Sequence, residues 1–599
     1  MKRVLLIFYV AFSANSIFAQ LYVKNNSYIF NKGTVVYSKG NLELNGTNSN
    51  FYLRNEGQFL QGTTGVSSNT GVGKLSVFQE GTVNNYAYNY WCSPIGNATL
   101  GVTTNENFGI TMLNLPLSNI ISAPATINSS SYNGFSGTGT LSIASYWIFK
   151  FLAQSNYAGW VQSAAATNIA AGQGFTMKGT SGSDLTAVGE VAANNPGSAQ
   201  RYDFRGKPND GNISVGVATN NFTLTGNPYP SALHVNAFLL DPTNTDCTGI
   251  AYYWEQDKTI NSHNLTAYRG GYGTFAPGGT LPTDYGVYVP AFFSSYNIDG
   301  TVNTTGSSSG LSIQRKYAPI GQGFMIKGKG TGSPTSVTLK NTQRAYYKES
   351  GAYSRFERIS NVNNYNQDNG INTTSHIRIN TIINNVNTRQ IALTFMPNAT
   401  DGVDRGIDAL SPDPDLTNDV YFFLANEKYV IEGVNFDIEK RIPIGVTVSN
   451  TTSFKFSLAE VVNFDENQDV YIYDAFDGVY HNLKQNDYEV VLQTGIYNNR
   501  FEITFKNQNL SIGQSVKESV VIFQDNANQQ LILSNPNLLD IKSVSLFDIL
   551  GKQLFDKVNL GLKTSYEFST AFLSEGVYLV KVQSNDGQNT TKKIIVSFK

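Results

Sequence analysis

The stretch Ser-Val-Ser-Leu-Phe-Asp-Ile-Leu-Gly-Lys, residues 543–552, places Val544 and Leu546 on one side of an extended chain and Ser545 and Phe547 on the other. This two-residue period is typical of a half-buried strand, and residues 549–552 supply the turn that follows it. The segments Leu-Ser-Glu-Gly-Val-Tyr-Leu-Val-Lys-Val (573–582) and Lys-Lys-Ile-Ile-Val (592–596) repeat the period, and Asn-Asp-Gly at 585–587 favours a hairpin between them. Residues 529–599 are therefore predicted to form a short all-β module.

The same three blocks, in this order at the end of the chain, resemble the type A C-terminal sorting domain of cargo proteins of the type IX secretion system, found in Gram-negative bacteria of the Bacteroidetes type. The resemblance covers residues 525–599. It implies an immunoglobulin-like fold, recognition of the tail by the secretion machinery, and later removal of the tail, with exchange for a lipopolysaccharide anchor as one outcome. The alternative is an ordinary immunoglobulin-like domain that ends a modular protein. The resemblance indicates an export route and implies no activity.

Length and composition predict several β domains. A chain of 599 residues is too long for one hydrophobic core. Apolar residues (41%) are ample for burial, whereas charged residues (14%) fall below the usual quarter of a globular sequence. Gly, Asn, Thr, Ser and Tyr make up the difference, and they favour strands and turns. We therefore expect an all-β, multidomain array of β-sandwich-like domains. The net charge of −2 predicts no general attraction to nucleic acid or to an anionic membrane.

The first residues are organised as a cleavable secretory signal, assigned to residues 1–19. Lys2-Arg3 form a basic start, residues 4–12 form an apolar core, and a cleavage site follows Ala19. The apolar core is too short to span a bilayer, and no later apolar run is long enough to do so. The mature chain is thus expected to have no membrane span and to pass through the periplasm to the outer cell surface or the medium.

The chain has two cysteines, Cys92 and Cys247. Export permits their oxidation, but the sequence leaves open whether their Cα atoms come close enough to pair.

Residues 20–84 contain short apolar segments separated by Gly and Asn, which predicts a small β-repeat unit, either a β-solenoid or a tight meander. An internal repeat follows. Gly-Gln-Gly-Phe-Thr-Met-Lys-Gly (172–179) recurs as Gly-Gln-Gly-Phe-Met-Ile-Lys-Gly (321–328), each after an aromatic-and-proline block (90–94 and 226–230) and a Tyr-Trp pair (146–147 and 253–254). The repeat predicts two related β domains, at 85–200 and 201–345.

A polar stretch at 346–370 is predicted to be a linker. Alternating segments then predict a β-sandwich domain over 371–515. The block at 399–409, together with Arg500-Phe501, resembles the sandwich that often precedes such sorting tails.

One acidic segment is a candidate calcium site. Carboxylates at this density suit Ca²⁺, and we assign Asp401, Asp404 and Asp408 as candidate ligands. The spacing is not that of an EF-hand, and the alternative is a solvated loop with Asx-turns. The segment as a whole contains Asp401, Asp404, Asp408, Asp413, Asp415 and Asp419.

The remaining patterns favour structural roles. Four tryptophans, at 91, 147, 160 and 254, lie among tyrosines; core packing is favoured over an exposed sugar-stacking surface. Gly-Ser-Ser-Ser-Gly (306–310) matches the nucleophile elbow in letters but lacks the required strand and helix around it. The four histidines lack the spacing of metal ligands. Apart from calcium, we therefore expect no cofactor.

The sequence thus predicts an exported cell-surface or secreted protein that is not an enzyme and has an adhesive or binding role. Its expected partners are the type IX secretion machinery, through the tail, and a glycan or other surface ligand. The alternative is a secreted protein that binds or degrades polysaccharide.

Overall fold

The computed structural model describes residues 20–597, except 190–191, 282–283, 298, 309–312, 352, 355–373, 414–415, 508–519, 537 and 586–588. Strands make up 52% of it and helices 3%, which confirms the predicted all-β class. The predicted signal peptide (1–19), Ser309 and Gly310 of the elbow-like segment, Asp415, and most of the predicted linker lie outside the described residues. No helix in the described part of the chain is long and apolar enough to cross a membrane.

The N-terminal unit is a β-solenoid built of three parallel sheets. The chain returns to the same sheet in each turn, with Leu21 beside Leu42, Tyr28 beside Asn50, and Val35 beside Gln58. A meander would pair its strands antiparallel, so the solenoid is the correct choice of the two. The sheets are β1 (Leu21–Val23), β4 (Leu42–Leu44) and β7 (Thr70–Gly71); β2 (Tyr28–Lys32), β5 (Asn50–Arg54) and β8 (Lys74–Glu80); and β3 (Val35–Ser38) and β6 (Gln58–Gln61).

The last solenoid turn continues directly into the next domain. Strand β22 (Arg201–Pro208) pairs antiparallel with β8, and β11 (Leu113–Pro116) and β12 (Ser122–Pro124) extend the same sheet. One hydrophobic core contains Phe51 of the solenoid together with Trp91 and Phe204. This sheet and core therefore cross the boundaries expected at 84 and 200.

The two repeat motifs form the same structure twice. In the first copy, β18 (Gly174–Lys178) pairs antiparallel with β9 (Tyr88–Cys92), and Gly174 lies opposite Cys92. In the second, β32 (Gly323–Gly328) pairs antiparallel with β24 (Phe222–Gly226), and Gly323 lies opposite Gly226. The register aligns Pro94 with Pro228, so the loosely matched aromatic-and-proline blocks occupy equivalent places.

The two copies also pack on each other through these motifs. A Cβ on Gly174 would lie 2.6 Å from Leu224 of the second copy, and one on Gly323 would lie 2.7 Å from the Trp91 backbone of the first. The Cys92 N–H donates to the Gly321 carbonyl at 2.8 Å, and the Thr225 hydroxyl donates to the Gly172 carbonyl at 2.7 Å. The glycines of each motif thus allow close approach of the other copy.

The two Tyr-Trp pairs, in contrast, have different structures. Tyr146-Trp147 belong to a 3₁₀ turn, η2 (Ser145–Trp147), whereas Tyr253-Trp254 lie within the long strand β26 (Cys247–Gln256). Their recurrence in the sequence does not reflect equivalent positions.

The second copy is a seven-stranded sheet with a short helix, α1 (Val235–Leu239). Besides β24, β32 and β26, the sheet contains β27 (Gly270–Ala276), β28 (Val287–Val289), β29 (Phe292–Tyr296) and β30 (Val302–Ser308). The elbow-like segment begins inside β30, so its described part is a strand.

Short peripheral elements complete both copies. In the first they are β10 (Ile95–Gly96), η1 (Ile110–Met112), β13 (Thr126–Asn128), β14 (Gly134–Gly137), β15 (Thr140–Ala144), β16 (Phe149–Phe151), η3 (Tyr157–Gly159), β17 (Trp160–Gln162), β19 (Thr180–Ser181), β20 (Asp184–Ala187) and β21 (Ala193–Asn195). In the second they are β23 (Ile213–Gly216), β25 (Ala232–His234), β31 (Tyr317–Ala318), β33 (Ser336–Leu339), η4 (Asn341–Gln343) and β34 (Arg344–Ala345).

The third domain is one long sheet folded around its own core. The Phe456 and Phe501 ring centroids lie 5.8 Å apart, although five strands separate β41 from β45 in the sheet. Its strands are β35 (His376–Ile383), β36 (Asn387–Phe395), β37 (Ala409–Leu410), β38 (Asp419–Leu424), β39 (Glu427–Val434), β40 (Arg441–Val448), β41 (Thr452–Val462), β42 (Tyr471–Asp474), β43 (Val479–Asn482), β44 (Tyr488–Leu492) and β45 (Gly495–Thr504).

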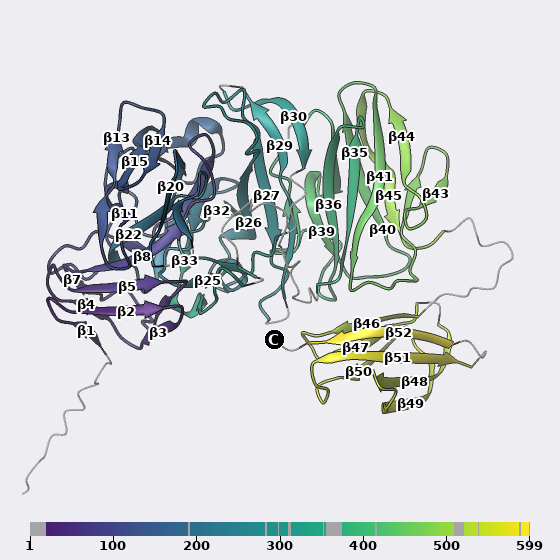
Figure 1. Ribbon diagram of the computed structural model, residues 1–599. Coiled ribbons are helices and arrows are strands. Elements are labelled where there is room, and N and C mark those ends of the chain that lie inside the picture. The colour runs from purple at the N-terminus through teal and green to yellow at the C-terminus, as the bar shows by residue number, and fades with distance from the viewer. Residues whose placement is uncertain are drawn as a thin grey trace, which may run out of the picture.

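This domain packs tightly on the second copy. Ala392, Val430 and Ile431 share a buried cluster with Tyr252 and other residues of β26 and β32. The Arg405 side chain donates to the carbonyls of Asn244 (2.7 Å) and Cys247 (3.0 Å). The solenoid, both copies and the third domain, which we call the body, are therefore joined by buried interfaces (Figure 1).

The C-terminal tail is a separate seven-stranded sandwich, drawn in yellow in Figure 1. One sheet is β46 (Val521–Asp525), β47 (Gln530–Ser534) and β50 (Ser565–Ser569); the other has the order β49 (Gln553–Leu562), β48 (Asp540–Asp548), β51 (Gly576–Ser584) and β52 (Asn589–Val596). Its first strand begins before the expected start at 525. The apolar residues of its core all come from the tail itself.

The local turn chemistry of the tail follows its sequence. The Asp548 carboxylate accepts from the backbone N–H groups of Leu550 and Lys552, both at 2.9 Å, and Gly551 adopts a positive φ of 83°. The predicted turn at 549–552 is therefore present. Strands β51 and β52 form the predicted antiparallel hairpin.

Candidate functional site

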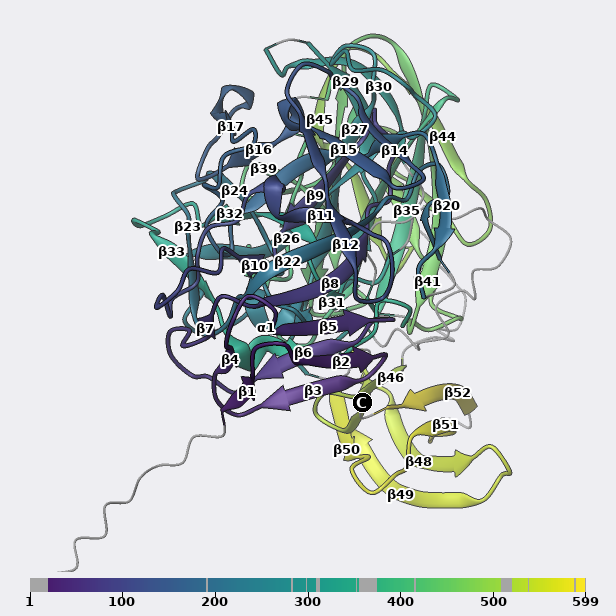
Figure 2. The ribbon, with the colours of Figure 1, turned by 60° about the vertical axis from the view of Figure 1, so that its left-hand side comes forward.

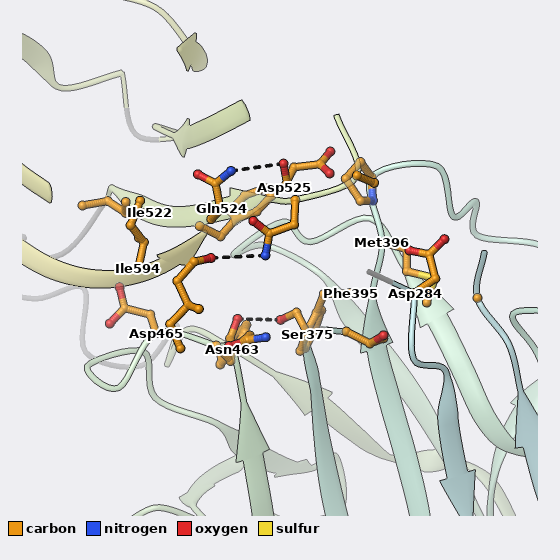
Figure 3. Close-up of a pocket in the computed structure, with 18 of the residues that line it drawn as sticks. Asp284, Ser375, Phe395, Met396, Asn463, Asp465, Ile522, Gln524, Asp525 and Ile594 are labelled. Atoms are coloured by element: carbon orange, nitrogen blue, oxygen red, sulfur yellow. Dashed lines mark hydrogen bonds between the residues drawn. The ribbon is translucent and has the colours of Figure 1, made fainter. Parts of the chain in front are cut away.

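A cleft of about 920 Å³ lies between the tail and the body (Figure 3). Residues 522–528 and 591–595 line the tail side, and Asp284, Phe395 and residues 463–467 lie on the body side. An ion pair between Lys592 Nζ and Asp465, at 3.5 Å, joins the two sides. Burial lowers the pKa of Lys592, since the charged amine loses hydration there. The cleft thus separates two units with their own cores, and at least one ion pair joins them across it.

Each candidate calcium ligand has a partner within the protein. The exposed Asp401 carboxylate pairs with Lys440. The Asp404 carboxylate accepts from the Thr400 hydroxyl at 3.1 Å, and Asp408 accepts from the Gly433 N–H at 2.7 Å. Asp413 and Asp419, farther along the segment, both lie against Arg389, at 3.5 and 2.9 Å.

Two carboxyl groups in this region are buried without a charged partner of opposite sign in contact. Burial is the main cause that raises the pKa of Asp408 to about 7 and that of Glu432 to about 8. The nearby charge of Asp404 raises the pKa of Asp408 further, and the charge of Asp408 raises that of Glu432. In the described part of the chain, no three His, Cys, Asp or Glu side chains are grouped so that they could hold a metal ion. The calcium site stays a prediction from the sequence.

The tryptophans mainly fill the interior, as favoured by the sequence. Trp91, Trp147 and Trp254 are buried, and Trp160 is half-buried. Trp254 stacks on Tyr90 across the two copies with a centroid distance of 6.0 Å. The aromatic residues that remain exposed near them are tyrosines.

An aromatic cluster with an exposed surface lies where the loops of the first copy meet a loop of the second. Tyr132 (55% exposed) precedes β14, and Tyr146 (44% exposed) lies in η2. Their centroids are 4.8 Å apart, and Trp147 lies 5.7 and 4.7 Å from them. His263, from the loop between β26 and β27, stacks on Trp147 at 5.1 Å.

The amine of Lys178 lies beneath this cluster. Lys178 is 4% exposed, and its Nζ lies 3.7 Å from the Trp147 ring centroid, 4.8 Å from that of Tyr88 and 3.1 Å from Nδ1 of His263. Burial lowers the pKa of Lys178 to about 7. Burial and the nearby Lys178 lower the pKa of His263 to about 4, so its ring is neutral at pH 7.

The repeat explains the place of this lysine. Lys178 lies opposite Tyr88 in its strand pair, and Lys327 lies opposite Phe222 in the second copy, where its Nζ is 5.5 Å from the ring. The sequence showed the recurring lysine but not its surroundings, because the Tyr-Trp pair at 146–147 has no structural equivalent in the second copy and His263 belongs to no motif. The two cysteines are both buried and free, so no disulfide joins Cys92 to Cys247.

Together these features define an all-β protein with an N-terminal solenoid, a body of fused β domains and a C-terminal sandwich that has its own core. The chain belongs to a family described as a domain of unknown function (DUF8693), whose model matches residues 8–505. A second domain of unknown function (DUF8694) matches residues 503–596. The two matches meet where β45 ends, at the division between body and tail. No curated protein matches this chain at a significant level.

Solved structures give distant likenesses. A DUF3244 family protein with an immunoglobulin-like β-sandwich fold from Bacteroides vulgatus is 14% identical over 14% of this chain and 92% of its own, with a TM-score of 0.13. Tp47, the 47-kilodalton lipoprotein of Treponema pallidum, is 11% identical over 65% of this chain and 92% of its own (TM-score 0.12). A BSP domain of a biofilm-associated protein is 11% identical over 65% of this chain and 67% of its own (TM-score 0.14). At these TM-scores the likenesses support no functional argument.

Proposed function

We propose that this protein is exported to the cell surface or the medium by its C-terminal tail, and that its body acts there by binding rather than by catalysis. The observation that carries the export role is the arrangement of the three sorting-like blocks. They lie on β48, β51 and β52, which are hydrogen-bonded neighbours in one sheet. Phe547, Leu579 and Lys593 stand side by side across these strands. Blocks that are distant in sequence thus form one continuous surface, as a recognition signal requires.

The separate core of the tail supports its proposed role as an export signal that can be cleaved off. Its apolar cluster contains residues such as Ile541, Val580 and Ile594, whereas the clusters of the body contain none from the tail. Loss of the tail therefore leaves the cores of the body intact. The Lys592–Asp465 ion pair is a polar contact that both residues can replace with water.

A binding role for the body is supported by its exposed tyrosine cluster. Monomeric proteins rarely expose several adjacent aromatic rings without a ligand or partner for them. The second candidate role, in which the body acts on polysaccharide, is favoured by the same tyrosines, because sugar rings stack on aromatic faces.

The export role is tested by deleting residues 520–599 in a host that has a type IX secretion system. We expect the shortened protein to fold and to accumulate in the periplasm. The matched control is Asp465→Asn on the body side, which removes the ion pair to the tail and leaves all three blocks unchanged; it should be exported normally. Delivery of the shortened protein to the surface or medium would refute the proposal.

A further inference from the structure

The exposed aromatic rings of Tyr132 and Tyr146, together with the buried Trp147, are arranged in a way that suits ligand binding. The Tyr132 and Tyr146 ring planes are 86° apart, and Tyr146 and Trp147 are 83° apart. The rings therefore make an angled surface, which can contact a ligand from two sides. Binding to the flat face of a crystalline polysaccharide would instead require coplanar rings.

Two exposed amide groups lie on the loops that contain Tyr132 and His263. Asn133, next to Tyr132 in the chain, is exposed, and its Oδ1 lies 2.8 Å from His263 Nε2 and accepts from Asn85. Asn261 is also exposed, and its Oδ1 accepts from Asn84 at 2.8 Å. These bonds fix the amide oxygens and leave the Nδ2 groups of Asn133 and Asn261 without a partner in the described part of the chain. Fixed amides beside aromatic rings can hydrogen-bond hydroxyl groups of a stacked ligand.

The interactions of these rings are almost free of charge. Among the described residues, no charged side chain other than Lys178 forms a hydrogen bond, ion pair or cation–π contact with Tyr132, Tyr146, Trp147 or His263. Lys178 is buried, burial lowers its pKa, and His263 is neutral at pH 7. These contacts suit an uncharged polyhydroxyl ligand, which needs no opposite charge.

We propose that the angled aromatic surface of Tyr132 and Tyr146, with the amides of Asn133 and Asn261, binds a single chain of a neutral, soluble polysaccharide. The inference rests on the proposed binding role of the body and names its ligand class. Pyranose faces stack on the two tyrosines, and ring hydroxyls take hydrogen bonds from the amides. Trp147 holds Tyr132 and Tyr146 in place from below.

The position of the surface suits an exported binding protein. It is formed around β14 and β15, which lie on the upper part of the body in Figures 1 and 2, whereas the tail lies below the body in both views. The tail therefore does not cover this surface.

The test uses the mature chain, residues 20–599, in affinity electrophoresis through gels that contain a soluble neutral polysaccharide (xyloglucan, mannan or β-1,3-glucan) or the acidic polygalacturonate. Titration calorimetry then measures Kd for a polysaccharide that retards the protein. We expect retardation by at least one neutral polysaccharide and none by polygalacturonate. Tyr132→Ala with Tyr146→Ala should weaken binding about tenfold or more, since two stacking contacts are lost.

Two variants control the result. Tyr132→Phe with Tyr146→Phe keeps both rings and should bind within about threefold of the native chain, because stacking does not need the hydroxyl groups. Tyr37→Ala removes an even more exposed tyrosine (64%) from the solenoid, and it should leave binding unchanged. Unchanged melting temperatures show that each variant is folded.

Retardation by no neutral polysaccharide, a preference for polygalacturonate, or full binding by the double alanine variant would each overturn the inference. None of these results affects the tail-deletion experiment, so the ligand class and the export role fail separately. Release of shortened sugars during the assay would overturn the non-catalytic part of the proposed function and leave the binding surface in place.

Discussion

Replacement of Lys178 by methionine tests the electrostatics of the aromatic cluster. The folded protein lowers the pKa of this amine from 10.5 to about 7, mainly through burial. At about 1.4 kcal/mol per pKa unit, a protonated Lys178 costs about 4–5 kcal/mol below pH 7. That shift is the net difference between the folded and unfolded environments, so the contacts of the amine with Trp147 and Tyr88 are already part of it.

The pH dependence follows from the direction of the shift. Because the folded-state pKa lies below the unfolded one, the unfolded state binds more protons between pH 7 and 10.5, and native stability rises across that window. The Lys178→Met variant has no titratable group at this position, so this part of the pH dependence is absent. We therefore expect the variant to melt a few degrees above the native chain at pH 6.5 and to lose this advantage as the pH approaches 10.5. His263 does not contribute, since its pKa of about 4 lies below the window.

Thermal melting followed by intrinsic fluorescence, from pH 6.5 to 10.5, measures the difference. Lys327→Met is the matched control, because Lys327 occupies the equivalent strand position but is only half-buried and lies near Glu427. Its difference from the native chain should depend less on pH. A Lys178→Met chain that melts below the native one at pH 6.5 would refute the reasoning, because the amine would then be charged and stabilising.

Three further outcomes are expected. Gly172→Ala should destabilise the protein more than Gly321→Ala: both glycines have a φ of +81°, but the new Cβ lies 2.8 Å from Ile213 in the first case and 3.5 Å from Trp91 in the second. Strain at positive φ alone costs about 1–2 kcal/mol, and chemical denaturation would show whether the pair differs. The calcium hypothesis requires that chelation lower the melting temperature of the mature chain and that Asp404→Asn with Asp408→Asn abolish this dependence; an unchanged melting curve leaves the carboxylates as turn caps. Far-UV circular dichroism should show less than about a fifth helix, and a higher value would contradict the all-β fold.

The calcium measurement needs the whole mature chain for a structural reason. Ala392, Val430 and Ile431 of the third domain are buried against the second copy. An isolated 371–515 fragment would expose this apolar face and would lose the hydrogen bonds of Arg405 to residues 244 and 247. Its melting would then report the lost interface as well as any metal effect.

The sequence predicted the strands well because their two-residue period records burial directly. In the tail, Val544, Leu546, Val580 and Val582 are all buried as the alternation required. The repeat motif was equally informative: the paired strands with Gly174 opposite Cys92 and Gly323 opposite Gly226 have the same register.

Contacts between distant segments could not be predicted, because no local pattern records them. The pairing of β8 with β22, which fuses the solenoid to the first copy, joins residues more than a hundred positions apart. The surroundings of Lys178 likewise depend on Trp147 from one loop and His263 from another. The Tyr-Trp recurrence was misleading for the same reason, since two identical residues do not determine the elements that contain them.

The central claim is that the tail is an export signal, and transfer of the tail to an unrelated reporter protein tests it most directly. Residues 520–599 would be fused to a fluorescent protein that carries a cleavable signal peptide and is then expressed in a bacterium with a type IX secretion system. The account predicts that the fusion reaches the cell surface or the medium, while the same reporter without the tail stays in the periplasm. Equal retention of both reporters in the periplasm would contradict it.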